Sequence, residues 1–124
     1  MHASTNIKTD IDFEREGKQV DVLRLPDSTN VSAMRTIPIP IAVIKRGTGP
    51  TMLLMGGNHG DEFEGPVVIA ELMRELEPGD IEGRIILLPC ANLPAVLAGT
   101  RNSPLDGQNM NRVFPGAADG PLTA

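Results

Sequence analysis

The chain has 124 residues, of which 40% are hydrophobic and 22% charged, a composition typical of one folded domain rather than a disordered or multidomain protein. Eleven basic and sixteen acidic side chains give a net charge of −5, which repels nucleic acid and anionic membrane surfaces. No apolar run approaches the roughly 20 residues that span a bilayer, the first residues lack a secretory signal pattern, and Cys90 has no second cysteine for an intrachain disulfide. We therefore expect neither a nucleic acid partner nor a membrane partner, and we predict a cytoplasmic protein.

The first part of the chain is expected to contribute an arm and edge strands. Residues 1–18 show little hydrophobic periodicity and are predicted to form a loose arm. Residues 19–50 are predicted to form edge strands, the first of them over residues 19–25, where hydropathy alternates. Residues 36–44 are rich in Ile and Val but contain two prolines. Because proline cannot donate to a sheet ladder, this segment is expected to be an edge strand or a bulged hairpin arm rather than a central strand.

Residues 51–116 carry the elements that indicate the fold class. Residues 51–55 and 84–88 are apolar runs that predict buried strands. Between them, apolar side chains recur at the helical spacing i, i+3, i+4, i+7, namely Ile69, Leu72, Met73 and Leu76. Pro66 fits the first turn of this helix and Pro78 ends it. Strand, helix and strand in this order form a parallel βαβ crossover, so the α/β class is predicted.

A second, short helix is expected after the second of these strands. Asn92 is a suitable N-cap and Gly99 a suitable C-terminal stop. From residue 100 onward the chain is polar and rich in turn residues, which predicts a long loop.

The glycine-rich turn at residues 56–66 is a candidate metal site, because it leaves a strand at the sheet edge where open α/β folds bind ligands. His59 and Glu62 lie three residues apart in it, and imidazole with carboxylate is a pair that Zn²⁺ accepts. The structural alternative is that His59 bonds a backbone carbonyl while Glu62 stabilises the positive end of the helix. Two further acids in the same turn, Asp61 and Glu64, favour the metal site. A phosphate site is disfavoured, because the glycines fit no phosphate-binding motif and three carboxylates would repel phosphate.

A second candidate site lies in the loop at residues 101–112, where two arginines flank a turn-rich segment. The guanidinium groups of Arg101 and Arg112 can bind carboxylates bidentately, and the amide of Asn111 can add a directed hydrogen bond. The alternative is that both arginines form surface ion pairs of little energetic value.

Three runs in combination resemble the succinylglutamate desuccinylase and aspartoacylase family, which comprises zinc-dependent amidohydrolases of the zinc carboxypeptidase fold. The runs are Gly-Asn-His-Gly-Asp-Glu at residues 57–62, Pro-Cys-Ala-Asn-Leu-Pro-Ala at residues 89–95, and Asn-Met-Asn-Arg-Val-Phe-Pro-Gly at residues 109–116. The resemblance implies a zinc-carboxypeptidase-like mixed sheet with a parallel βαβ core, incomplete in this chain.

The same resemblance implies roles for individual residues. His59 and Glu62 become two of three protein ligands of Zn²⁺, and Arg112 with Asn111 becomes the clamp for the free carboxylate of the substrate. Arg101 is implied to be catalytic and to stabilise the charge that develops on the scissile carbonyl oxygen, while zinc polarises that carbonyl. The implied reaction is hydrolysis of the amide bond of a small-molecule N-acyl amino acid.

The chain departs from the family pattern because the third zinc ligand and the general base, a downstream histidine and glutamate, have no match. His2 and Cys90 are weak substitutes as ligands. We therefore expect the amino-terminal part of a longer enzyme, inactive by itself, with self-association into a homo-oligomer left open. Two alternatives remain: a non-catalytic α/β module that binds a cation such as Ca²⁺ or Mg²⁺ or serves assembly, and a carboxypeptidase that acts on peptides.

Overall fold

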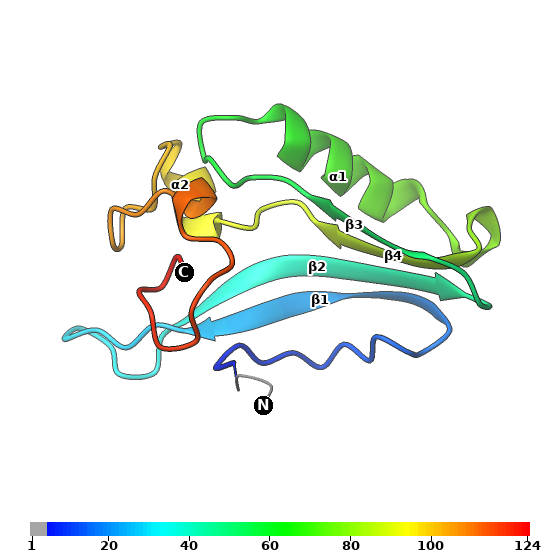
Figure 1. Ribbon diagram of the computed structural model, residues 1–124, viewed down its shortest axis with the longest axis horizontal. Helices are drawn as coiled ribbons and strands as arrows, with labels where there is room; N and C mark the ends of the chain where they lie inside the picture. The colour runs from blue at the N-terminus through cyan, green and yellow to red at the C-terminus, as the bar shows by residue number, and fades with distance from the viewer. Residues whose placement is uncertain (1–4) are drawn as a thin grey trace.

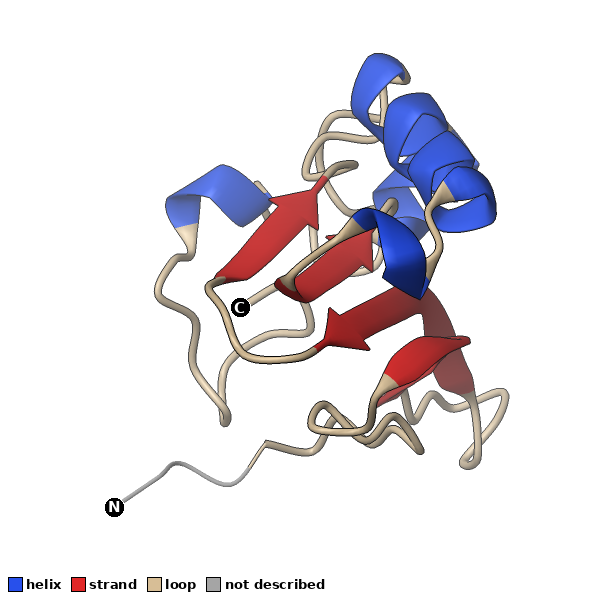
Figure 2. Cartoon of the chain, turned by 90° about the vertical axis from the view of Figure 1, so that its right-hand side faces the viewer, coloured by secondary structure: helices blue, strands red, loops and turns tan. Residues whose placement is uncertain are grey.

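The computed structural model describes residues 5–124 and contains a four-stranded mixed sheet in the order β1-β2-β4-β3 (Figures 1 and 2). Strands β1 (Gly17–Pro26) and β2 (Thr36–Arg46) form a long antiparallel hairpin. Strand β4 (Gly83–Leu88) pairs antiparallel with β2 and parallel with β3 (Thr51–Met55). The predicted α/β class and the parallel β3–β4 pair are confirmed.

Helix α1 (Glu64–Glu75) connects the two parallel strands and covers one face of the sheet (Figure 1). Its apolar positions pack as the periodicity predicts: Ile69 is buried, and Leu72, Met73 and Leu76 contact the same core cluster as the buried strand residues Ala42, Ile44 and Leu87. Pro66 lies in the first turn. A 3-10 turn at Pro78–Asp80 follows the end of the helix, so the predicted proline stop is confirmed.

The second helix, α2 (Leu93–Ala98), begins and ends where its capping residues predict. The side chain of Asn92 accepts a hydrogen bond from the Ala95 N–H at 3.4 Å. Gly99 ends the helix with a left-handed φ of 64°, a conformation that costs glycine little. Beyond it, the described chain is loop apart from a 3-10 turn at Met110–Arg112. None of the helices in residues 5–124 is long and apolar enough to cross a membrane.

The expectation of an edge strand at residues 36–44 is wrong, because β2 lies between β1 and β4. The alternative, a hairpin arm, is correct except for the bulge, because β2 pairs with β1 in one continuous register. The prolines are tolerated because β4 is shorter than β2. It pairs with β2 only from Ala42 to Arg46, whereas Pro38 and Pro40 lie opposite β1 alone. The missing N–H groups therefore interrupt no ladder to β4.

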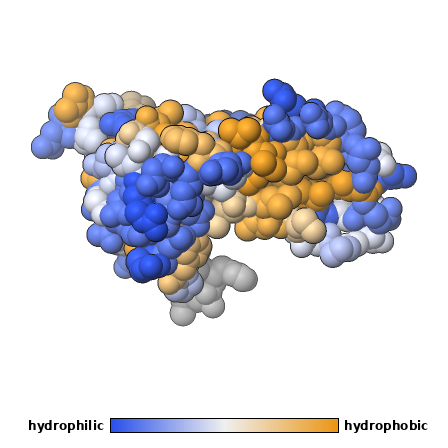
Figure 3. Space-filling view, turned by 90° about the horizontal axis from the view of Figure 1, so that it is seen from above, coloured by the Kyte–Doolittle hydropathy of each residue, from blue (hydrophilic) through white to orange (hydrophobic). Residues whose placement is uncertain are grey.

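The expectation that residues 51–55 form a buried strand is also wrong, because β3 is an edge of this sheet. Met52 is 56% and Leu53 54% exposed. The large apolar side chains that β3 and α1 leave exposed are Met52, Leu53, Met55, Val67 and Val68. Figure 3 shows an apolar region on the side of the molecule that carries these two elements.

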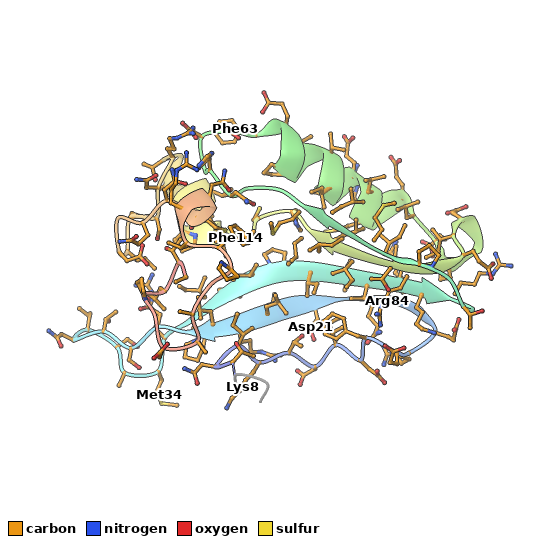
Figure 4. All side chains as sticks on the ribbon, in the orientation of Figure 1. Lys8, Asp21, Met34, Phe63, Arg84 and Phe114 are labelled. Atoms are coloured by element: carbon orange, nitrogen blue, oxygen red, sulfur yellow. The ribbon has the colours of Figure 1, made fainter. Side chains whose placement is uncertain are left out.

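Residues 5–16 of the predicted loose arm form no helix or strand but contact the sheet, and residues 1–4 lie outside the described residues. Lys8 forms an isolated antiparallel bridge with Arg24 of β1, beside which it is seen in Figure 4. Ile11 is buried with Ile41 and Val43 in a second core cluster, on the sheet face opposite α1. The arm therefore covers part of this face and helps to bury Ile41 and Val43 of β2.

Candidate metal and substrate site

The turn after β3 and the segment after β4 lie side by side, because both follow the carboxyl ends of the parallel pair. Hydrogen bonds hold the two segments together. The Ala91 N–H donates to the Gly56 carbonyl at 2.9 Å, and the Asn92 N–H donates to the Gly57 carbonyl at 3.0 Å. Gly60 donates to the Thr100 carbonyl at 2.8 Å, and a Cβ at Gly60 would lie only 1.9 Å from the Ala95 carbonyl oxygen of α2. Only glycine fits this contact, and it holds the turn that carries His59.

His59 and Glu62 converge in this turn. The imidazole Nδ1 lies 3.2 Å from Glu62 Oε1. The His59 residue is 5% exposed, whereas the Glu62 side chain is 61% exposed. The buried imidazole therefore presents Nδ1 to the accessible carboxylate of Glu62. In this arrangement the nitrogen and the carboxylate oxygen can reach one ion.

Asn109 bonds the other nitrogen of the ring, with Nε2 and Asn109 Oδ1 2.9 Å apart. The backbone N–H of Asn111 donates to the same Oδ1 at 3.0 Å, which identifies that atom as the oxygen. His59 Nε2 must therefore be the donor, and in the neutral imidazole Nδ1 carries the lone pair. With the ring neutral, Nδ1 and Glu62 Oε1 are two facing acceptors, and either a proton on Nδ1 or a shared cation would satisfy them.

This donor set fits zinc. Zn²⁺ binds imidazole nitrogen and carboxylate oxygen at ~2.0–2.2 Å, so two ligand atoms 3.2 Å apart can share one ion. A ligating histidine commonly donates its other N–H to a neighbouring oxygen, as His59 does to Asn109. The residues present offer two candidate ligands, and across residues 5–124 no group of three His, Cys, Asp or Glu side chains converges.

Neither of the weak substitutes supplies a third ligand among the described residues. Cys90 belongs to no such group, and burial raises the pKa of its thiol, which disfavours the thiolate that binds metal. His2 lies outside the described residues.

Arg101 reaches the metal turn from the loop after α2. Its guanidinium lies 3.4 Å from Glu62 Oε1, the oxygen that faces His59, and both side chains are more than half exposed. The ion pair by itself is worth little. It does place a cationic side chain beside the candidate ligand, as the implied role of Arg101 requires.

Asn111 and Arg112 lie in the 3-10 turn and are exposed. The Asn58 side chain, in the metal turn, donates from Nδ2 to Asn111 Oδ1 at 2.9 Å. Arg112 donates to the Asn111 carbonyl at 3.3 Å and forms no salt bridge with any carboxylate of residues 5–124. Its charge is therefore available to an anionic ligand, in contrast to the surface ion pair that the sequence alone left open.

Two residues of this site, Asn58 and Asn109, are not among the candidates from the sequence. Asn58 directly precedes His59, and Asn109 lies two residues before Asn111. For Asn58 and Asn109, the only sequence signal is an amide within two residues of a candidate site residue. Their contacts span 53 and 50 residues, respectively, which no local pattern reveals.

An apolar cavity of about 290 Å³ lies elsewhere, between the β1–β2 hairpin and the loop at residues 103–124. Its lining includes Leu23, Ile39, Phe114 and Leu122. None of the five candidate site residues lines it, so it does not belong to this site.

Comparison with known proteins identifies close relatives. The model of the succinylglutamate desuccinylase/aspartoacylase catalytic domain matches residues 48–124. The chain is 50% identical over 117 residues to an N-alpha-acetyl-L-2,4-diaminobutyric acid deacetylase of Halomonas elongata, a match that covers 94% of the chain and 34% of the relative. This match agrees with the resemblance to such deacetylases that the runs at residues 60–65 and 103–109 indicate.

Solved structures agree with this result. A succinylglutamate desuccinylase/aspartoacylase from Rhodobacter sphaeroides superposes with a TM-score of 0.93 at 49% identity, covering 96% of the chain and 37% of that structure. The product-bound ectoine utilization protein EutE (DoeB) from Ruegeria pomeroyi gives 0.94 at 47% identity, covering 98% and 37%. The chain thus spans about a third of the length of these relatives.

Proposed function

The chain belongs to the succinylglutamate desuccinylase/aspartoacylase family, and from this premise we propose that it supplies two zinc ligands and the carboxylate clamp of an amidohydrolase that cleaves N-acylated amino acids. The observation that carries the proposal is the 3.2 Å approach of His59 Nδ1 to Glu62 Oε1. The Asn109 contact supports it, because a neutral ring that donates from Nε2 turns its Nδ1 lone pair toward Glu62, where a shared cation could bind.

Each polar residue then has one task. His59 and Glu62 hold the zinc, which when bound supplies a Lewis acid that polarises an amide carbonyl. Arg101, beside Glu62, stabilises the negative charge that develops on the carbonyl oxygen. Arg112, which has no carboxylate partner within residues 5–124, binds the free carboxylate of the substrate, and Asn111 adds a hydrogen bond to it.

The substrate to test first is N-α-acetyl-L-2,4-diaminobutyrate. This choice rests on the 50% identity to the Halomonas elongata deacetylase. The clamp explains recognition of the carboxylate that all N-acyl amino acids share, and it does not by itself select a side chain.

We propose further that the third ligand and the general base are supplied by residues outside these 124, since the chain spans about a third of the length of its relatives. The two-ligand site and the exposed apolar edge at β3 support this view. The 124 residues alone are then inactive even with zinc added, and hydrolysis at an ordinary enzymatic rate would contradict the proposal. The proposed function also includes a cytoplasmic location and a small-molecule N-acyl amino acid as the partner.

The test of the proposed function is His59→Ala in the protein expressed from its complete reading frame. The variant should lose stoichiometric zinc and deacetylase activity together, while Asn30→Ala, a change at an exposed residue of the β1–β2 loop, should retain both. Retention of zinc and activity in His59→Ala would remove this residue from the site. Bound Ca²⁺ or Mg²⁺ without hydrolysis would instead indicate a cation-binding module, and cleavage of peptides alone would indicate a carboxypeptidase.

A further inference from the structure

Asn58 is a polar residue of the metal turn to which neither the metal site nor the clamp assigns a role. It lies between Gly57 and His59 and is half-buried. Its backbone is held by the N-cap residue of α2. The Asn92 N–H donates to the Gly57 carbonyl at 3.0 Å, and Asn92 Nδ2 donates to the Asn58 carbonyl at 3.5 Å. Asn58 therefore projects from a fixed main chain.

The side chain of Asn58 spans the gap between the two functional loops. Its Nδ2 donates to Asn111 Oδ1 at 2.9 Å, although the residues are 53 positions apart. Among the described residues this is the only side-chain partner of the side-chain amide of Asn111. The position of that amide relative to the metal turn thus depends on Asn58.

A parallel contact lies one residue further along the turn, where His59 bonds Asn109. Both contacts join the metal turn to the loop at residues 101–112, but they involve different side chains of that loop. The His59–Asn109 bond orients a candidate zinc ligand, whereas the Asn58–Asn111 bond orients a candidate substrate ligand. Loss of each should therefore have its own functional signature.

We propose that Asn58 is a positioning residue for substrate binding, which holds Asn111 Oδ1 so that the Nδ2 of the same amide is left to donate to the substrate carboxylate beside Arg112. The proposal rests on the proposed function, because it takes Asn111 and Arg112 as the clamp. With Oδ1 held by Asn58, the Asn111 amide can turn its Nδ2 donors toward the substrate, and such donors bind a carboxylate more strongly than a neutral carbonyl.

The experiment compares Asn58→Ala, Asn58→Asp and Asn111→Ala in the protein expressed from its complete reading frame. Steady-state kinetics are measured with N-α-acetyl-L-2,4-diaminobutyrate and with its neutral carboxamide, and the zinc dissociation constant is measured by chelator competition. Asn58→Ala should raise KM for the carboxylate substrate on the order of fivefold, with a smaller change in kcat. Its effect on the carboxamide and on zinc affinity should stay within about twofold.

Two further variants separate positioning from a general structural role. Asn58→Asp keeps the size of the side chain but removes the donor, so KM should rise at least as much as in Asn58→Ala. The double variant Asn58→Ala/Asn111→Ala should have the KM of Asn111→Ala alone, because Asn58 acts through Asn111. Asn30→Ala serves as the matched control, because it truncates an exposed asparagine outside the site, and it should resemble the wild type.

Additive effects in the double variant, a wild-type KM in Asn58→Asp or Asn58→Ala, or an equal loss for the carboxamide would each overturn the proposal. Arg112→Ala, measured in parallel, distinguishes the two levels of failure. If Arg112→Ala raises KM for the carboxylate substrate and Asn58→Ala does not, the clamp stands and only the role of Asn58 fails. If neither raises KM, the clamp itself is wrong and the role of Asn58 fails with it.

Discussion

His59 donates from Nε2 to Asn109 Oδ1 at 2.9 Å, and this contact determines which nitrogen of the ring faces Glu62. Because the Asn111 N–H donates to the same oxygen, the amide cannot reverse without losing a backbone hydrogen bond. A neutral His59 ring is therefore held by the fold in the tautomer with its lone pair on Nδ1, the form that can bind a metal ion.

Asn109→Ala should weaken zinc binding by 10- to 100-fold, on the order of other losses of a partner that orients a ligand. The ring would keep its position in the turn but lose the acceptor that holds the proton on Nε2. Chelator competition in the protein expressed from its complete reading frame measures this affinity. Asn109→Asp, which retains an acceptor, should bind zinc at least as tightly as the wild type, and a loss equal to that of Asn109→Ala would contradict the argument.

Arg101→Ala should lower kcat by roughly 10²–10³-fold, as removal of a group that stabilises transition-state charge does. The KM for the carboxylate substrate should change little, because Arg101 lies beside Glu62 rather than in the clamp. Arg112→Ala should show the opposite pattern, with a steep rise in KM that is much weaker for the carboxamide. Stopped assays over a range of substrate concentration separate kcat from KM, and identical profiles for the two variants would refute the division of roles.

Gly60→Ala should destabilise the fold by at least about 2 kcal/mol, because the new Cβ would lie 1.9 Å from the Ala95 carbonyl oxygen. Relief of this contact would require the metal turn to move away from α2. Gly79→Ala is the matched control, since a Cβ at Gly79 has no neighbour within 4 Å. Urea unfolding followed by circular dichroism gives both values, and equal midpoints for the two variants would show that the turn is free to shift.

The carboxylate of Asp106 holds the last described residues of the chain. It accepts hydrogen bonds from the Thr123 N–H at 2.8 Å, the Thr123 hydroxyl at 2.7 Å and the Gln108 N–H at 3.0 Å. Burial alone would raise the pKa of Asp106, but these hydrogen bonds, together with one from Ser103, lower it below its ordinary value of 3.8.

Because the pKa of Asp106 is lower in the folded state than in the unfolded one, its stabilising effect is present above the unfolded value. The effect is lost as pH falls through the folded value. Protection of the Thr123 amide from hydrogen exchange, corrected for the intrinsic rate, should therefore be full at neutral pH and decline below about pH 4. Asp106→Asn should lower that protection at neutral pH and abolish its decline with acid. A decline of the same size in Asp106→Asn would assign the pH dependence to another group.

The α1 crossover and the α2 caps could be predicted from the sequence because the information is local. The repeat of Ile69, Leu72 and Leu76 lies within two helical turns, and Asn92 and Gly99 bracket α2. The edge position of β3 and the internal position of β2 could not be predicted in the same way. Which strand is an edge depends on partners distant in sequence, and so does the register that pairs β4 with Ala42–Arg46 of β2 and leaves the prolines beyond it.

The sequence by itself determined the chemical groups of the site: one imidazole, one carboxylate and two arginines on loops that follow parallel strands. Only the tertiary structure decided how they face one another. The contacts of His59 with Asn109 and of Asn58 with Asn111 close loops of 50 residues or more, so they form only once β3 and β4 are paired and α2 is docked. The physical reason is that side-chain identity is fixed by the chain, whereas the direction of a hydrogen bond depends on where the fold places its partner.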